Sequence, residues 1–371
     1  MSALGDIIEA ALAKPRNLSA RQIETLVAVE DPAEIRAVRE AAYALKVRHC
    51  GKTVSMRGLV EQGNVCAKDC LYCGIRKSNA AVRRYSLPYE EVLRAAEEAA
   101  RLHYGSIVLQ SGEIESEEHT RFVEKCLRGM QALPGGPFGI TLSLGEQEDG
   151  VYRRWKAAGA SRYLLRIETS NRELYAAMHP EGHSWERRRR CLDVLRACGY
   201  QTGTGAMSGL PGQTARDLAA DVEFFAECDA DMIGMGPFIP HRETPMGAGA
   251  AVTPEFKARQ LRTGLNMISA VRLFLHDVNI AATTALQTLA PDGREQGVLA
   301  GANVMMPNVT DVKWRKDYAL YEGKPCTDEN AAMCRGCLER RLAAIGETVN
   351  YGKRGDSAHF FARCAAAGTR A

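Results

Sequence analysis

The chain has 371 residues, of which 46% are hydrophobic and 25% are charged, and its formal net charge at pH 7 is +3. This composition is typical of globular proteins, and no basic stripe interleaved with aromatic residues indicates a nucleic-acid partner. No uncharged span approaches the roughly 18 residues that a membrane helix needs, and residues 1–14 lack the basic start and apolar run of a signal peptide. We therefore expect a cytoplasmic protein whose twelve cysteines are metal ligands or buried thiols.

Residues 1–50 are predicted to form an N-terminal helical extension. Ser19, with Gln22 three residues later, makes a capping box that opens one helix. Asp31 followed by Pro32 places a capping residue before proline at the first helical position, and this second helix should end near Gly51.

After residue 50, short β-type runs alternate with amphipathic helices. The predicted strands are 54–60, 106–110, 140–143, 163–167, 202–207, 232–236, 279–283 and 303–306. The helical stretches between them include 88–104, 117–132, 184–198, 214–228 and 254–274. Repeated βα units favour a parallel sheet with helices outside, and eight units predict a complete (β/α)8 TIM-type barrel over residues 51–320. A doubly wound open sheet is the rival fold, but its G-x-G-x-x-G fingerprint is absent.

Cys66, Cys70 and Cys73 follow the first predicted strand with the spacing C-x3-C-x2-C, and Tyr72 precedes the last of them. Thiolates are the ligands of iron–sulfur clusters, and a [4Fe–4S] cubane takes four of them. If only the three cysteines of this loop bind the cluster, one of its irons has no protein ligand and can bind another molecule. A structural zinc site usually needs four protein ligands, and a disulfide would strand one cysteine. The spacing favours an iron–sulfur cluster, with zinc and a disulfide as alternatives.

Polar and glycine residues gather where the predicted strands end. These segments are 111–113, 144–146, 168–170, 208–214, 236–241, 283–284 and 307–308. Barrel enzymes build their sites at this carboxyl-terminal rim, and the cysteine loop lies on the same rim. Polar residues are also common at strand ends simply because turns favour them, which is the alternative explanation. Because polar residues follow one predicted strand after another, we expect them to form a single pocket.

Residues 321–371 are predicted to form a C-terminal extension with a second cysteine group. Cys326, Cys334 and Cys337 are spaced C-x7-C-x2-C. Small cysteine sites bind both iron and zinc, so zinc and simple surface thiols stay open beside a second iron–sulfur site.

The cysteine loop, with an aromatic residue between its last two cysteines, resembles the signature loop of the radical S-adenosylmethionine (SAM) enzymes. Further runs resemble one family of them, the HydE maturases of [FeFe]-hydrogenase. These runs are 57–77, 108–113, 165–169, 209–214, 236–241, 282–285 and 302–308. In this chain Ser111 replaces the first glycine of the usual Gly-Gly-Glu, a departure that the family shares. The resemblance covers nearly the whole predicted barrel.

The resemblance implies that Cys66, Cys70 and Cys73 hold a [4Fe–4S] cluster whose open iron is chelated by SAM. The residues expected around the cluster-bound SAM are Tyr72, Ser111, Gly112, Glu113, Ser143, Glu168, Arg187, Met235 and Tyr318. Cys326, Cys334 and Cys337 would hold a second [2Fe–2S] or [4Fe–4S] cluster, dispensable for the chemistry.

The resemblance also implies that Arg166, Thr283 and Thr284 form the floor of the substrate cavity. An arginine beside hydroxyls would suit an anionic group. Other interpretations of these side chains remain: Arg166 paired with Glu146 or Glu168, Arg187 solvated on its helix, and Tyr318 used only for packing.

The implied activity is reductive cleavage of SAM to methionine and a 5′-deoxyadenosyl radical, with the electron coming from an external donor of the flavodoxin or ferredoxin type. The implied substrate is a cysteine-ligated Fe–CO–CN precursor of the hydrogenase H-cluster, handled together with other hydrogenase maturases.

Two rival functions stay open. One is a HydE-like or methylornithine-synthase-like enzyme that acts on an amino-acid-derived substrate. The other is an iron–sulfur electron carrier without turnover, although a carrier has no need of the polar residues at the strand ends.

Overall fold

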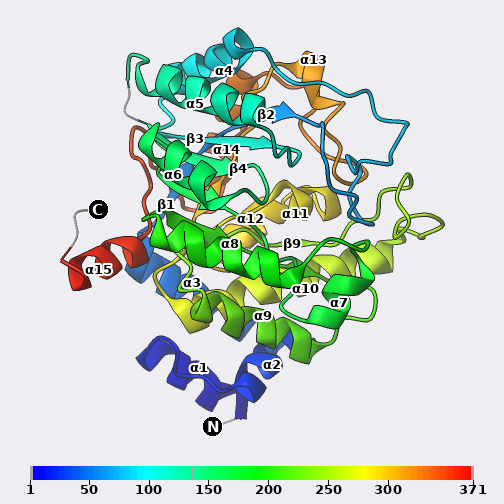
Figure 1. Cartoon of the computed structure of the whole chain (residues 1–371). Helices are drawn as coiled ribbons and strands as arrows, with labels where there is room; N and C mark the ends of the chain where they lie inside the picture. Colours follow the sequence, from blue (N-terminus) through cyan, green and yellow to red (C-terminus); the bar gives the residue numbers. More distant parts are fainter. Residues whose placement is uncertain (1–2, 136–137, 369–371) are drawn as a thin grey trace.

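The computed structural model describes residues 3–135 and 138–368 (Figure 1). Its N-terminal helices are α1 (Ala3–Ala13), α2 (Ala20–Ala28) and α3 (Pro32–Cys50). Ser19 and Gln22 form the predicted capping box, and Asp31 accepts hydrogen bonds from the first turn of α3. Both predicted helix starts are therefore confirmed. Contacts of α2 with α9 and α10 hold this part against the rest of the protein.

The centre of the molecule is a parallel sheet of seven strands in the order β10-β8-β6-β5-β4-β3-β2. These strands are β2 (Gly58–Gly63), β3 (Ser106–Ser111), β4 (Gly139–Ser143), β5 (Arg162–Leu164), β6 (Gln201–Thr204), β8 (Met232–Ile233) and β10 (Asn279–Ile280). The run Ile107, Val108 and Leu109 in β3 is fully buried, as expected for a strand covered on both faces. An α/β fold with a parallel sheet is therefore confirmed.

Two shorter sheets complete the strand pattern. β1 (Thr53–Met56) lies between β11 (Val304–Met305) and β12 (Thr348–Val349), and β7 (Met207–Ser208) pairs with β9 (Gly236–Pro237). Parallel bridges join Ala281, next to β10, to Val304 of β11, and Leu59 of β2 to Asn308, three residues after β11. The segment 304–308 thus contacts both edges of the seven-stranded sheet.

Three predicted strands are interrupted in the structure. Run 54–60 is divided at Arg57 into β1 and β2, run 202–207 into β6 and β7, and run 232–236 into β8 and β9. Gly205 and Gly234 lie at the last two interruptions. A Cβ atom on Gly205 would lie 2.1 Å from the carbonyl oxygen of Gly234, so the backbones approach there as only glycine allows.

Helices cover the outside of the sheet (Figure 1). The long ones are α4 (Tyr89–Arg101), α5 (Glu117–Gln131), α6 (Asp149–Ala157), α8 (Trp185–Ala197), α9 (Ala215–Glu227) and α10 (Pro254–Leu275). The short ones are α7 (Arg172–Ala177), α11 (Thr284–Leu289), α12 (Gly293–Leu299) and α13 (Val312–Arg315). The five predicted helices are all present, and α6 and the four short helices are additions to them. Among the described residues, no helix has the length and apolar character needed to cross a bilayer.

The C-terminal segment, which contains α14 (Ala331–Ala344) and α15 (Ala358–Ala366), returns to the amino-terminal ends of the strands. Arg162, fully buried at the start of β5, donates to the carbonyl of Arg354 at 2.6 Å and pairs with Asp356. Gly355 accepts hydrogen bonds from Arg57 and from Asn279. Residues 354–356 thus close the sheet end opposite the strands' carboxyl ends, and we call them the floor segment.

Helix α15 is held by His359, whose two ring nitrogens contact Asp229 at 2.9 Å and Asp277 at 3.2 Å. These hydrogen bonds raise the pKa of His359 to about 9, and burial opposes the shift only in part. Cys364 is buried in this helix.

We expect the free energy of unfolding to fall as the pH rises through about 9. A raised folded-state pKa contributes stability that is complete below the unfolded value of about 6.5 and is lost above the folded value, here roughly 2 to 3 kcal/mol. Urea unfolding between pH 6 and 10 would measure this. His359→Gln, which keeps polar atoms but does not titrate there, should remove the slope, and an unchanged slope would contradict the assignment.

Candidate active site

One cavity of about 340 Å³ opens among the carboxyl ends of the strands. Its lining includes residues predicted for the cluster, for SAM and for the substrate. The predicted residues that line it are Cys66, Cys70, Tyr72, Cys73, Ser111, Gly112, Glu113, Ser143, Arg166, Glu168, Thr283, Thr284, Tyr318, Cys326 and Cys334. Of the predicted site residues, Arg187, Met235 and Cys337 are not in the lining. The gathering of the strand ends into one pocket is therefore present in the structure.

The cysteine loop is held close to the end of β3. The backbone N–H of Glu113 donates to Cys66 Sγ at 3.3 Å, and the N–H of Ala67 donates to the carbonyl of Glu113 at 2.8 Å. A Cβ atom on Gly112 would lie 2.2 Å from the carbonyl oxygen of Val65. Glycine at position 112 is therefore a steric requirement of this approach.

Arg84 fastens the cysteine loop from outside the motif. Its guanidinium donates to the carbonyls of Asn64 and Ile75, both at 2.7 Å, and also to the carbonyls of Arg76, Lys77 and Asn79. A guanidinium offers five N–H donors in a rigid plane, so one side chain can fix several carbonyls of an irregular loop. Nothing in the sequence distinguished this arginine from its neighbours.

The thiols of the loop are suited to a metal cluster. Burial raises the pKa of all three, that of Cys70 to about 12. A buried thiolate therefore needs a cationic partner, and iron is one that thiolates prefer. Cys326 and Cys334 belong to a separate group with Glu329. Three sulfurs on one loop beside an open cavity fit a [4Fe–4S] cluster with one iron accessible.

Four charged side chains form a network behind the cysteine loop. The ammonium group of Lys68 lies 3.1 Å from both Glu113 and Glu146, and Arg188 contacts Glu146 at 2.7 Å and Glu113 at 4.0 Å. Burial raises the pKa of Glu113, and the charge of Arg188 opposes this only in part. Burial has the same tendency at Glu146, but the charges of Arg188 and Lys68 outweigh it and lower the pKa. All four side chains are almost completely shielded from water, and the pKa values of the two carboxyl groups shift in opposite directions.

Arg187 and Arg188 point to different surroundings. Arg187 is 35% exposed and pairs with Glu115 at 2.7 Å, whereas Arg188 is 8% exposed and lines the cavity. The resemblance had implied Arg187 as the arginine near SAM. The sequence contained a signal for Arg188. It lies three, four and seven positions before the buried residues Cys191, Leu192 and Leu195, a spacing that places it on the buried face of the helix.

The other side of the cavity carries the predicted substrate residues. Arg166 pairs with Glu168 at 2.8 Å, which was one of the two interpretations left open for it. The hydroxyl of Thr283 is buried with no hydrogen-bond partner in the described chain, and Thr284 shares a 2.8 Å hydrogen bond with Tyr321. Glu168 has a φ of 69°, a left-handed conformation that a non-glycine residue adopts only under constraint. Unpaired and constrained polar groups of this kind are typical of binding sites.

Tyr318 is buried in the cavity wall, where its hydroxyl accepts a hydrogen bond from Gln110 at 3.1 Å. Lys324 donates to its carbonyl and pairs with Glu61. Met235 is buried between two glycines that do line the cavity, Gly234 and Gly236.

The second cysteine group shares the same cavity. Cys326 and Cys334 line it, and Arg294 approaches Cys326 at 3.9 Å. The third ligand atom near these two thiols belongs to Glu329, with all three ligand atoms within 4.8 Å of one another. Cys337 lies one turn further along α14 and does not join that group in the structure.

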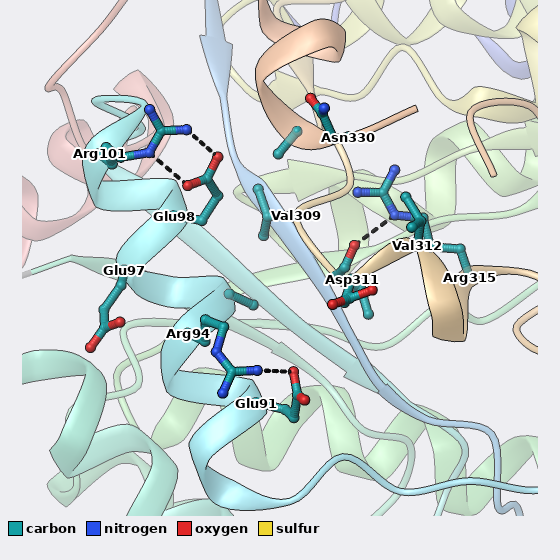
Figure 2. Close-up of a pocket in the computed structure, with 13 residues that line it drawn as sticks. Glu91, Arg94, Glu97, Glu98, Arg101, Val309, Asp311, Val312, Arg315 and Asn330 are labelled. Atoms are coloured by element: carbon teal, nitrogen blue, oxygen red, sulfur yellow. Dashed lines mark hydrogen bonds and ion pairs between the residues drawn. The ribbon is translucent and has the colours of Figure 1, made fainter. Parts of the chain in front are cut away.

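A second pocket lies on the outer surface between α4 and residues 309–315 (Figure 2). Four of its charged side chains are paired with one another, Arg94 with Glu91 at 2.8 Å and Arg101 with Glu98. None of its lining residues belongs to the cysteine loop. The chemistry-bearing groups are therefore those of the inner cavity.

The chain resembles known proteins in sequence and in fold. The family model described as "Radical SAM superfamily" matches residues 60–225. The [FeFe] hydrogenase maturase subunit HydE of Thermotoga maritima is 38% identical over 331 residues, which are 89% of this chain and 92% of that protein. A biotin synthase of Thermus thermophilus is 28% identical over 240 residues, 62% of this chain and 71% of that one. The crystal structure of methylornithine synthase (PylB) matches with a TM-score of 0.78 at 21% identity and covers 93% of this chain and 98% of its own.

The fold, the three-cysteine loop and the family model together define a radical SAM enzyme, a class that uses a [4Fe–4S] cluster and SAM. Within the radical SAM class, the 38% identity to the Thermotoga HydE subunit over 89% of this chain determines the family. The chain belongs to the HydE family.

Proposed function

We propose that this enzyme cleaves SAM reductively in the assembly of the [FeFe]-hydrogenase H-cluster, with a cysteine-ligated Fe–CO–CN species as its substrate. The observation that carries the proposal is the single cavity that joins the cysteine loop to polar groups at the strand ends, in a chain 38% identical to a hydrogenase maturase. When bound, the cluster and SAM supply an electron and a 5′-deoxyadenosyl radical.

In this proposal Cys66, Cys70 and Cys73 hold the cluster. Glu113, positioned by its hydrogen bond from the backbone N–H of Glu146 at 2.8 Å, would receive the amino group of SAM. Arg188, in place of the predicted Arg187, would balance the carboxylate of SAM, since Arg188 lines the cavity and Arg187 does not. The remaining lining residues assigned to SAM are Tyr72, Ser111, Gly112, Ser143, Glu168 and Tyr318.

The substrate would lie beside Arg166, Thr283 and Thr284. The free hydroxyl of Thr283 and the cationic Arg166 can together bind an anionic group such as a carboxylate or a cyanide ligand. Closure of the cavity protects a reactive species, because excluding water suppresses side reactions. The bridges of segment 304–308 to both edges of the sheet support a complete eight-stranded (β/α)8 barrel, which would supply that closure.

We further propose that an external flavodoxin- or ferredoxin-type donor reduces the enzyme, and that it acts with other hydrogenase maturases. A second cluster at Cys326 and Cys334 is part of this proposal, with Cys337 or Glu329 as the further ligand.

Anaerobic reconstitution with iron, sulfide, SAM and a reductant tests the proposed function. We expect 5′-deoxyadenosine to form, and to form faster with a cysteine-ligated Fe–CO–CN complex than with an amino-acid substrate. Cluster formation without 5′-deoxyadenosine under any condition would support the electron-carrier alternative. Stimulation by an ornithine- or lysine-derived compound alone would support the methylornithine-synthase-like one.

A further inference from the structure

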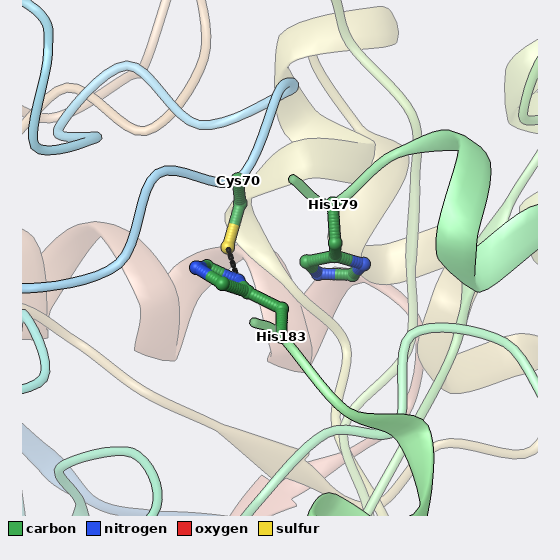
Figure 3. Close-up of side chains that lie close together, drawn as sticks. All are labelled: Cys70, His179 and His183. Atoms are coloured by element: carbon green, nitrogen blue, oxygen red, sulfur yellow. Dashed lines mark hydrogen bonds between the residues drawn. The ribbon is translucent and has the colours of Figure 1, made fainter. Parts of the chain in front are cut away.

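Two histidines lie beside Cys70, on the connection between α7 and α8 to which the sequence analysis gave no role. One nitrogen of His179, one of His183 and the sulfur of Cys70 lie within 4.8 Å of one another, and Figure 3 shows both rings close to the sulfur. The same connection also contacts the cysteine loop through its backbone, because the N–H of Leu71 donates to the carbonyl of Met178 at 3.0 Å. Cys70 is therefore supported by a distant segment of the chain.

The hydrogen bonds of His183 determine which of its nitrogens carries the proton. The backbone N–H of Asp69 donates to Nε2 at 3.5 Å, so Nε2 is an acceptor and the neutral ring has its proton on Nδ1. Nδ1 lies 4.0 Å from Cys70 Sγ. The Nδ1–H group is thus a donor directed at the sulfur.

His179 has a different arrangement. Its Nδ1 lies 2.8 Å from the carbonyl of Tyr175, which can only accept, so the proton is on Nδ1 and the buried Nε2 keeps a lone pair. The ring stacks on Tyr175 with centroids 4.0 Å apart and meets Tyr72 edge-on at 5.6 Å. His179 therefore cannot donate to Cys70, and it packs against the loop and against His183.

We propose that His183 is a positioning residue that donates its Nδ1–H to the Cys70 sulfur when that sulfur binds the cluster, and thereby raises the reduction potential of the cluster. The inference rests on the proposed function, since it requires Cys70 to be a cluster ligand. A hydrogen bond to a thiolate stabilises the more negative, reduced cluster, and such bonds are among the factors that set cluster potentials.

The test is a redox titration of the reconstituted enzyme without SAM, followed by electron paramagnetic resonance. At the midpoint potential of the wild type, His183→Phe should lower the ratio of reduced to oxidised cluster roughly threefold, about 28 mV at 59 mV per tenfold for one electron. His183→Gln, whose amide N–H can replace the donor, should restore most of the ratio. His119→Phe, at a buried histidine beside Trp155, is the matched control and should change nothing.

An unchanged ratio in His183→Phe at full cluster content would overturn the proposal, as would equal losses in the Phe and Gln variants. The readout does not involve SAM cleavage. A wild type that binds a cluster but never forms 5′-deoxyadenosine would therefore refute the proposed function and leave the hydrogen bond to be judged on the potentials alone.

Discussion

Replacing Cys70 with alanine is expected to abolish both the cluster of the loop and SAM cleavage, with 5′-deoxyadenosine formation reduced at least about a thousandfold. The remaining two thiols cannot complete a three-sulfur site, and a [4Fe–4S] cluster without its protein ligands is lost. Iron and sulfide content, the electron paramagnetic resonance signal and the product assay would each report the loss.

Cys334→Ala is the matched comparison, because Cys334 lines the same cavity but belongs to the other cysteine group. It should leave cleavage largely intact while lowering total iron, if iron occupies that group. Equal loss of cleavage in both variants would show that the roles of the two groups have been misassigned.

Replacing Arg188 with methionine should lower the free energy of unfolding by about 3 kcal/mol and weaken SAM binding about a hundredfold or more. Arg188 neutralises two buried carboxylates, Glu146 at 2.7 Å and Glu113 at 4.0 Å. Without it they share Lys68, and Glu146 keeps only a longer contact of 3.6 Å with Arg187. Removing one partner of a buried charge pair typically costs about 3 to 5 kcal/mol. Urea unfolding and equilibrium SAM binding measure the two effects.

Arg187→Met provides the control, since Arg187 forms its closest ion pair, with Glu115, at the surface. Exposed pairs contribute at most about 1 kcal/mol, so stability should change little. If Arg187→Met weakened SAM binding more than Arg188→Met, the original sequence-based choice of Arg187 would be right and the choice made from the cavity lining would be wrong.

Local patterns in the sequence predicted the parts of the fold that depend on neighbouring residues. The capping box at Ser19, the Asp31-Pro32 start and the helix opening at Ser184 are determined within one turn of chain, and all three are present. The spacing of Cys66, Cys70 and Cys73 is likewise local. Parallel strand order and the α/β class follow from the alternation of βα units.

Contacts between distant segments could not be predicted in this way. Lys68 and Arg188 meet the carboxylates of Glu113 and Glu146 only after four segments have packed together. Arg84 meets the loop carbonyls only when the loop has folded back. His179 and His183 were missed because more than 100 residues separate them from Cys70. The H-x3-H spacing of His179 and His183, which zinc ligands also use, was the local signal that could have pointed to them.

The floor segment bears on the order in which the protein folds during synthesis. Arg57 and Arg162 leave the ribosome long before their partners, since Gly355 follows Arg57 by 298 residues and Asp356 follows Arg162 by 194 residues. Two buried guanidinium groups thus stay without those partners until residues 355 and 356 have been synthesised. Contacts over 194 and 298 residues also make folding slow, since loop closure must precede them. A nascent chain arrested before residue 354 should therefore expose an unfinished sheet end and depend on chaperones.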